Sequence, residues 1–88
     1  MNYKATLKQR IITTNEIIKP DNFSSWEIIN YGTNAVIVND AIILNTGERF
    51  KLDLMPNVTF DSLIQIKFDT SENGTSKAAI LKLYNKIV

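Results

Sequence analysis

Residues 35–44, AVIVNDAIIL, decide the fold of this chain. Two apolar blocks of four residues flank Asn39 and Asp40, which tolerate the positive φ angles that a two-residue type I′ turn requires. The stretch therefore predicts a tight β-hairpin, and a loop of two residues fixes its register. The predicted cross-strand pairs are Val38–Ala41, Ile37–Ile42, Val36–Ile43 and Ala35–Leu44.

Both faces of this predicted hairpin are wholly apolar. One face carries Val36, Val38, Ala41 and Ile43, and the other carries Ala35, Ile37, Ile42 and Leu44. Leaving the second face in water would forgo about 5–9 kcal/mol, at roughly 1.5–3 kcal/mol for each large side chain. That loss is comparable to the whole stability of a small domain, so we expect the face to be covered. We favour coverage by the chain itself; the alternative is another subunit, since an exposed apolar patch marks an interaction site.

Short amphipathic strands flank the hairpin. Apolar and polar residues alternate over residues 50–54 and again over residues 64–68. Each pattern is typical of a strand with one wet face and one core face, and turn signals recur between the strands. The sequence therefore predicts an all-β fold, a single small β-sandwich or jelly-roll-like barrel of about seven or eight short antiparallel strands.

The two ends of the chain are also predicted to be strands. The C-terminal run places Ala79, Leu81 and Leu83 on one side, and Ala78, Ile80, Lys82 and Tyr84 on the other. It follows a predicted hairpin loop, SENGTS, which favours a strand over a short helix. At the N-terminus the β-branched run IITT favours a strand. We treat residues 1–88 as one β domain, with 1–10 as an N-terminal arm or edge strand.

Composition disfavours several function classes. The net charge is +1, and the ten Lys and Arg residues are scattered along the chain and matched by nine acids, so no nucleic-acid partner is expected. The chain has no Cys and no His, which removes thiolate chemistry and the commonest general base and metal ligand. Without a long apolar run or a signal peptide, neither a membrane partner nor export through a cleaved signal is expected.

The sequence contains few candidate groups of metal-binding or catalytic residues. Asp69, Glu72 and Asn73 offer oxygens for a weak calcium site, but solvated loop residues are the preferred interpretation. Gly32 and Gly47 are isolated, so we interpret them as turn residues, with Gly47 in the left-handed position of a hairpin bulge. We expect no enzymatic activity, no cofactor and no metal.

Aromatic residues offer an alternative function. Tyr3, Trp26, Tyr31 and Tyr84 are the residue types that a sugar-binding surface needs. Trp26 lies on an alternating strand, however, and is predicted to be a core anchor. A small carbohydrate-binding or adhesin-type β-sandwich module is therefore the alternative, and it would need Trp26 to be exposed.

The run WEIINYGTNAVIVNDAIILNTGERFKLDL, residues 26–54, resembles a pattern found in small β-sandwich proteins of tailed-phage virions: a strand, a short turn, a hairpin, then a Gly-Glu turn into an amphipathic strand. The positions that carry the resemblance are Trp26, Asn30, Gly32, Thr33, Val36, Val38, Leu44, Gly47, Glu48 and Phe50. All are scaffold positions, so no catalytic residue is transferred. The chain departs from the pattern at Asp40, where glycine is commoner.

The resemblance implies a structural role. The chain would be a capsid decoration or head or tail accessory protein that binds other virion proteins, or a second copy of itself, through apolar and edge-strand contacts. It would reside in the virion, or in the cytoplasm of the producing cell before assembly. The candidate interface residues are Tyr3, Leu7, Ala35, Ile37, Ile42 and Leu44.

Overall fold

The computed structural model describes residues 3–55, 58 and 60–87, and the side chains of Tyr3, Lys86 and Ile87 lie outside this described part. Its strands are β1 (Tyr3–Ile12), β2 (Glu16–Ile18), β3 (Ser25–Asn30), β4 (Val36–Val38), β5 (Ile42–Leu44), β6 (Arg49–Asp53), β7 (Ile64–Phe68) and β8 (Ala78–Ile87). They form two antiparallel sheets of four strands: sheet 1 in the order β1-β8-β3-β6 and sheet 2 in the order β2-β7-β4-β5. The predicted all-β sandwich is confirmed.

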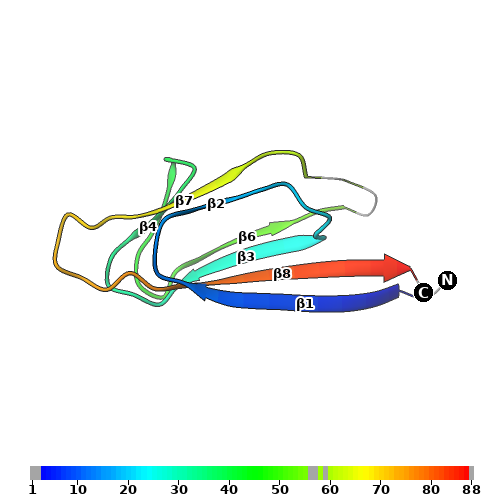
Figure 1. Ribbon diagram of the computed structural model, residues 1–88, viewed down its shortest axis with the longest axis horizontal. Helices are drawn as coiled ribbons and strands as arrows, with labels where there is room; N and C mark the ends of the chain where they lie inside the picture. Colours follow the sequence, from blue (N-terminus) through cyan, green and yellow to red (C-terminus); the bar gives the residue numbers. More distant parts are fainter. Residues whose placement is uncertain (1–2, 56–57, 59, 88) are drawn as a thin grey trace.

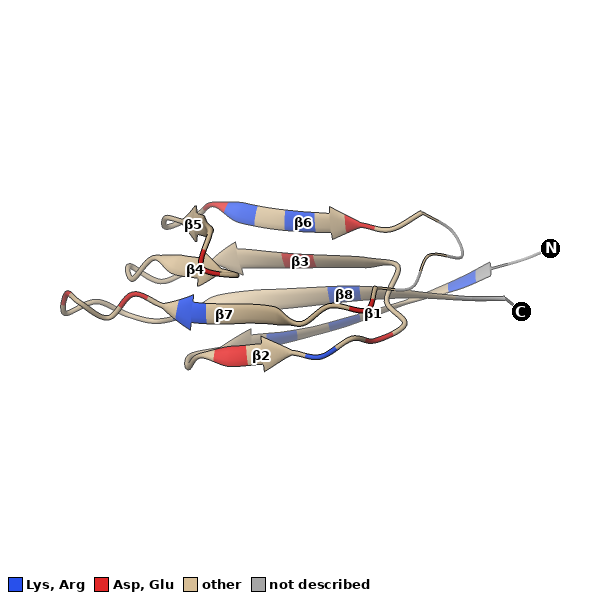
Figure 2. Ribbon diagram, turned by 90° about the horizontal axis from the view of Figure 1, so that it is seen from above, with Lys and Arg blue, Asp and Glu red and all other residues tan. Residues whose placement is uncertain are grey.

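The two sheets lie face to face as two layers (Figure 1). Seen from above, β2 lies over β1, β7 over β8, β4 over β3 and β5 over β6 (Figure 2). β1 and β8 are ten residues long and pair along their whole length. Because β3 pairs only with residues 78–83 of β8, the far ends of β1 and β8 continue beyond it as a two-stranded ribbon. The molecule is accordingly elongated, at 51 × 20 × 17 Å.

Alternating residues from both sheets build one core. The buried cluster consists of Ile12, Ile18, Phe23, Trp26, Ile28, Val36, Val38, Leu44, Ile64, Ile66, Phe68, Ala78 and Ile80. Trp26 is wholly buried, and its indole meets the Phe50 ring edge-on, with 6.3 Å between the ring centroids. The prediction that Trp26 anchors the core is therefore confirmed.

The predicted register of the 35–44 hairpin is wrong by one residue. The observed pairs are Val36–Leu44, Ile37–Ile43 and Val38–Ile42. Asn39 and Asp40 do take positive φ angles of 53° and 56°, but Ala41 joins them in a three-residue loop. A shift of one residue exchanges the faces of one strand. Here the shift turns the large side chains of Ile42 and Leu44 toward the core and leaves the small Ala41 in the loop, so more apolar surface is buried.

A buried amide joins the turn after β3 to the end of β5. The Asn30 side chain is fully buried, and its Nδ2 donates to the carbonyl oxygens of Asn34 at 2.9 Å and Leu44 at 3.0 Å. Its Oδ1 accepts a hydrogen bond from the backbone N–H of Gly32 at 2.9 Å. One side chain thus contacts three backbone groups, of which the Gly32 N–H also donates to the Lys77 carbonyl oxygen at 2.9 Å.

Two glycines are needed for these turns. Gly47 has a φ of 83°, which confirms its predicted left-handed position, and its N–H donates to the Asn30 carbonyl oxygen at 2.7 Å. A Cβ at Gly32 would collide with the carbonyl oxygen of Thr75 and lie 2.8 Å from the backbone nitrogen of Lys77. Both glycines therefore have a steric or conformational role, as the sequence predicted.

Candidate functional site

The predicted interface residues do not form one surface. Leu7 is 55% exposed on the outer side of sheet 1, whereas Ala35 and Ile37 are half-buried and belong to the side of sheet 2. Leu44 is buried in the core and Ile42 packs against it, so their assignment to an outward face is wrong. The physical reason is the register shift of the hairpin. The side chain of Tyr3 lies outside the described part of the chain.

Outward apolar side chains, among which Ile29 is buried, lie instead in adjoining positions on the outer side of sheet 1. The strand register aligns Leu7 with Leu83 and places Ile11, Ala79 and Ile29 in one row across three strands. We call this surface the apolar face, and its members are Leu7, Ile11, Ile29, Ala79, Leu81 and Leu83. Leu7 and Ile11 are each more than half exposed. Part of the face is hollowed, with a volume of about 720 Å³. Apolar residues such as Ile11, Ile29 and Leu81 line this hollow together with the polar residues Gln9, Arg10 and Lys77.

The sequence predicted one element with two apolar faces, the 35–44 hairpin, which the structure retains with Ile37 and Ile43 facing outward, but the prediction missed a second such element in β8. The alternation over the C-terminal run already put Ala79, Leu81 and Leu83 opposite the core residues Ala78 and Ile80. Residues 78–81 are thus apolar on both sides of the strand, which is the signal that could have located the apolar face. The pattern locates the apolar face only when the strand order is known, because β8 lies between β1 and β3 and so joins the outward residues of three strands.

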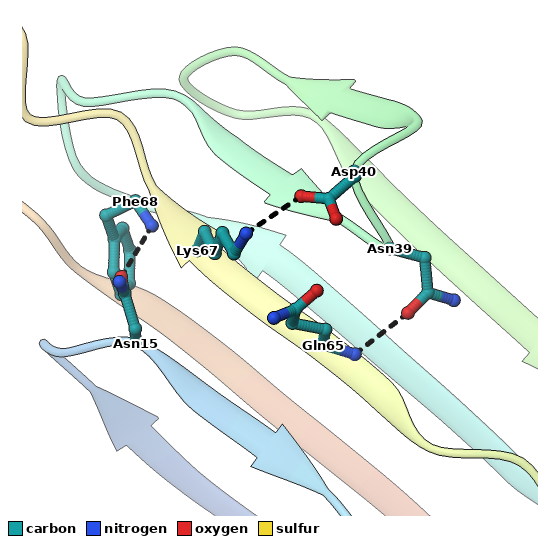
Figure 3. A network of polar contacts seen from close by, with 6 residues as sticks. All are labelled: Asn15, Asn39, Asp40, Gln65, Lys67 and Phe68. Atoms are coloured by element: carbon teal, nitrogen blue, oxygen red, sulfur yellow. Dashed lines mark hydrogen bonds and ion pairs between the residues drawn. The ribbon is translucent and has the colours of Figure 1, made fainter.

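The outer side of sheet 2 is interrupted by polar contacts (Figure 3). Lys67 Nζ lies 3.0 Å from Asp40 Oδ1, and Lys67 pairs in register with Ile37. At the tip of the hairpin, Asn39 Oδ1 accepts from the backbone N–H of Gln65 at 2.8 Å. These contacts fix the hairpin loop on β7 and break the apolar surface between the exposed side chains of Ile17 and Ile43.

We expect Ile43→Lys to change the free energy of unfolding by no more than about 0.5 kcal/mol, as for an ordinary surface substitution. Ile43 is 63% exposed on the short edge strand β5, where a lysine can reach water. Urea denaturation of the variant checks this. A loss above about 1 kcal/mol would return Ile43 to the core, as the predicted register required.

The acidic and aromatic candidates do not converge. Asp69 Oδ1 accepts from the Ser71 backbone N–H at 3.0 Å, and within the described residues no three carboxylates gather as metal ligands. Tyr31 lies beside Lys77, before β8 begins, whereas Tyr84 lies near the other end of that strand. With Trp26 buried, these rings do not make one stacking surface for a sugar.

One exposed contact ties the loop before β3 to β8. The Tyr84 hydroxyl donates to Asp21 Oδ2 at 2.6 Å. This hydrogen bond, assisted by the Asn22 backbone N–H, lowers the pKa of Asp21 below its ordinary value. Burial, and then the same hydrogen bond to Asp21, raises the pKa of Tyr84 to about 12.

This contact predicts a loss of stability at both ends of the pH scale. The folded pKa of Asp21 is lowered, so its contribution is present above the unfolded value of 3.8 and is lost as the pH falls through the folded pKa. The folded pKa of Tyr84 is raised, so its contribution is present below the unfolded value of 10.0 and is lost as the pH rises toward 12. Urea denaturation across both windows should give a flatter pH dependence for Tyr84→Phe than for wild type. Identical pH profiles would contradict the prediction.

No helix in the described part of the chain is long and apolar enough to cross a membrane. Comparisons of the chain with protein-family models, with curated proteins and with solved structures found no match. The functional argument therefore depends on the surfaces of the sandwich itself.

Proposed function

We propose that this chain is a non-enzymatic structural protein that binds other protein subunits, as an accessory subunit of a tailed-phage virion. The observation that carries the binding role is the apolar face of sheet 1. The virion assignment comes from the resemblance over residues 26–54. In this role the chain resides in the particle, and in the cytoplasm of the producing cell before assembly.

The arrangement of charge around the apolar face supports a protein partner. The outward residues of β6 and of the neighbouring part of β3 are charged, with Arg49 Nη1 3.9 Å from Glu27 Oε2 and Lys51 Nζ 3.6 Å from Asp53 Oδ1. The apolar half of the sheet thus adjoins a polar half in which the two signs alternate. An apolar centre with a polar rim is the usual anatomy of a protein–protein interface.

The dimensions of sheet 1 limit such a contact. β1 and β8 span about 33 Å, but β3 and β6 have six and five residues, so four strands lie side by side over only about 17–20 Å of that length. At about 4.8 Å per strand the outer surface is about 500 Å², less than the roughly 800 Å² that each partner buries in a standard interface, so a partner of that size also contacts an edge of the sheet. The side chains of Leu7 and Ile11 are more than half exposed, so covering them removes the most apolar surface from water.

Particle association tests the proposal. In cells that produce the protein, a tagged chain should sediment with large particles, and the double variant Leu7→Gln with Ile11→Gln should remain in the low-mass fraction. Both side chains are more than half exposed, so the fold should tolerate the change. Ile43→Lys on the outer side of sheet 2 is the matched control and should still sediment. A wild-type chain found only at low mass would refute the role.

A further inference from the structure

Basic residues that are far apart in the sequence meet on one side of the β1–β8 ribbon. Lys8 lies directly opposite Lys82, and the backbone of Lys4 pairs with that of Lys86. Lys4 and Lys8 share this side with Arg10 because side chains alternate along a strand. Lys4, Lys8, Arg10 and Lys82 are four of the ten Lys and Arg residues of the chain, and Figure 2 shows the basic positions along β1. Basic residues that are scattered in the sequence therefore lie on one side of the folded ribbon.

This row of basic residues is only partly neutralised. Arg10 Nη1 contacts both carboxylate oxygens of Glu16, at 2.8 and 2.9 Å. Among the described residues, no carboxylate lies within ion-pair distance of Lys8 or Lys82, and Lys8 Nζ lies 5.1 Å from the centroid of the Tyr84 ring.

The Asp21 carboxylate, which accepts from the Tyr84 hydroxyl, is nevertheless near enough that Lys82 and Lys8 contribute to lowering its pKa. Like charges directly opposite each other destabilise a strand pair. Asp21 offsets part of the repulsion between Lys8 and Lys82, and an anionic partner would offset more of it, including that at Lys4.

The same strand has an unpaired edge. β1 is the outermost strand of sheet 1, so one side of its ten-residue backbone has no neighbouring strand in the described part of the chain. Its other row of side chains, Ala5, Leu7, Gln9 and Ile11, is uncharged and continues into the apolar face. β1 therefore presents a basic row on one face and an uncharged row on the other, beside free backbone groups.

We propose that the edge of β1 binds an extended acidic segment of a partner protein, which adds to sheet 1 as a fifth strand. Acidic side chains of that segment lie opposite Lys4 and Lys8, and apolar side chains lie beside Leu7 and Ile11. This inference depends on the proposed structural role in one respect, namely that the partner is a protein.

Two other occupants fit the edge less well. A second copy pairing through β1 would bring Lys and Arg rows together, which lysines on edge strands normally prevent. A nucleic acid would use the positive charge but would leave the backbone edge and the uncharged row without partners. An added strand matches all three features, because its own repeat places residues four apart at about 13 Å, the spacing of Lys4 and Lys8.

A labelled peptide of sequence Val-Glu-Val-Thr-Val-Glu-Val is the probe, since its charges match Lys4 and Lys8 in either strand direction. Fluorescence anisotropy should give binding at least about tenfold tighter than for the same peptide with Lys in place of Glu. Lys8→Glu should lower the affinity for the acidic peptide by about tenfold and raise the affinity for the lysine peptide. Only a folded variant can show such a gain in affinity. Lys51→Glu, at an exposed position on β6 at the opposite edge of sheet 1, is the matched control and should bind like wild type.

Three results would overturn the inference: equal binding of both peptides, amide NMR shifts that avoid β1, or tighter binding of a single-stranded DNA oligonucleotide than of the acidic peptide. The test is separable from particle association. If Lys8→Glu reverses the peptide preference while the wild-type chain never sediments with particles, only the virion role fails. If the chain sediments and the acidic peptide does not bind, only the strand-addition inference fails.

Discussion

Replacing Asn30 with Ala is expected to lower the free energy of unfolding by about 2–4 kcal/mol, because two buried carbonyl oxygens lose the same donor at once and each unsatisfied group costs about 1–3 kcal/mol. These are the carbonyl oxygens of Asn34 and Leu44, whereas the N–H of Gly32 keeps its second acceptor, the carbonyl oxygen of Lys77. Urea denaturation followed by the fluorescence of Trp26, the single tryptophan, measures the loss.

Asn30→Asp separates hydrogen bonding from shape. It keeps the volume and the acceptor for Gly32 but replaces the Nδ2 donor by an oxygen that faces the carbonyl oxygens of Asn34 and Leu44. We expect a loss at least as large as that of Asn30→Ala, and a larger one at neutral pH than at acidic pH, where a protonated carboxyl can donate one hydrogen bond. A variant as stable as wild type would mean that the side chain fills space and that its two donor bonds contribute nothing.

The alternation of apolar residues was sufficient to predict most of the fold. It identified the strands at residues 50–54 and 64–68, and it placed Trp26 in the core, because a one-sided burial pattern is local information. The register of the 35–44 hairpin was not local information. A two-residue and a three-residue loop both suit Asn39 and Asp40, and the choice depends on which side chains the opposite sheet can bury.

The surfaces were harder to predict because pairing between distant strands creates them. β1 and β8 come from opposite ends of the chain, and their register alone brings Lys8 against Lys82 and Leu7 against Leu83. The alternating pattern of each strand can be seen in the sequence, but the sequence does not show that β1 and β8 are neighbours. The Asn30 amide was missed for the same reason: the carbonyl oxygen of Leu44 that it satisfies comes from another sheet.

Trp26→Ala is expected to cost about 3–5 kcal/mol, as for other large-to-small changes at a wholly buried aromatic residue. Trp26→Phe should cost less, about 1–2 kcal/mol, because it leaves a smaller cavity than alanine. A second reason is that the indole Nε1 is buried with no hydrogen-bond partner in the described part of the chain, and phenylalanine removes that unsatisfied donor while keeping a ring against Phe50. Both variants lack the fluorescent indole, so circular dichroism must follow their urea denaturation. If Trp26→Phe were as unstable as Trp26→Ala, filling the full volume of the indole would outweigh the unsatisfied donor.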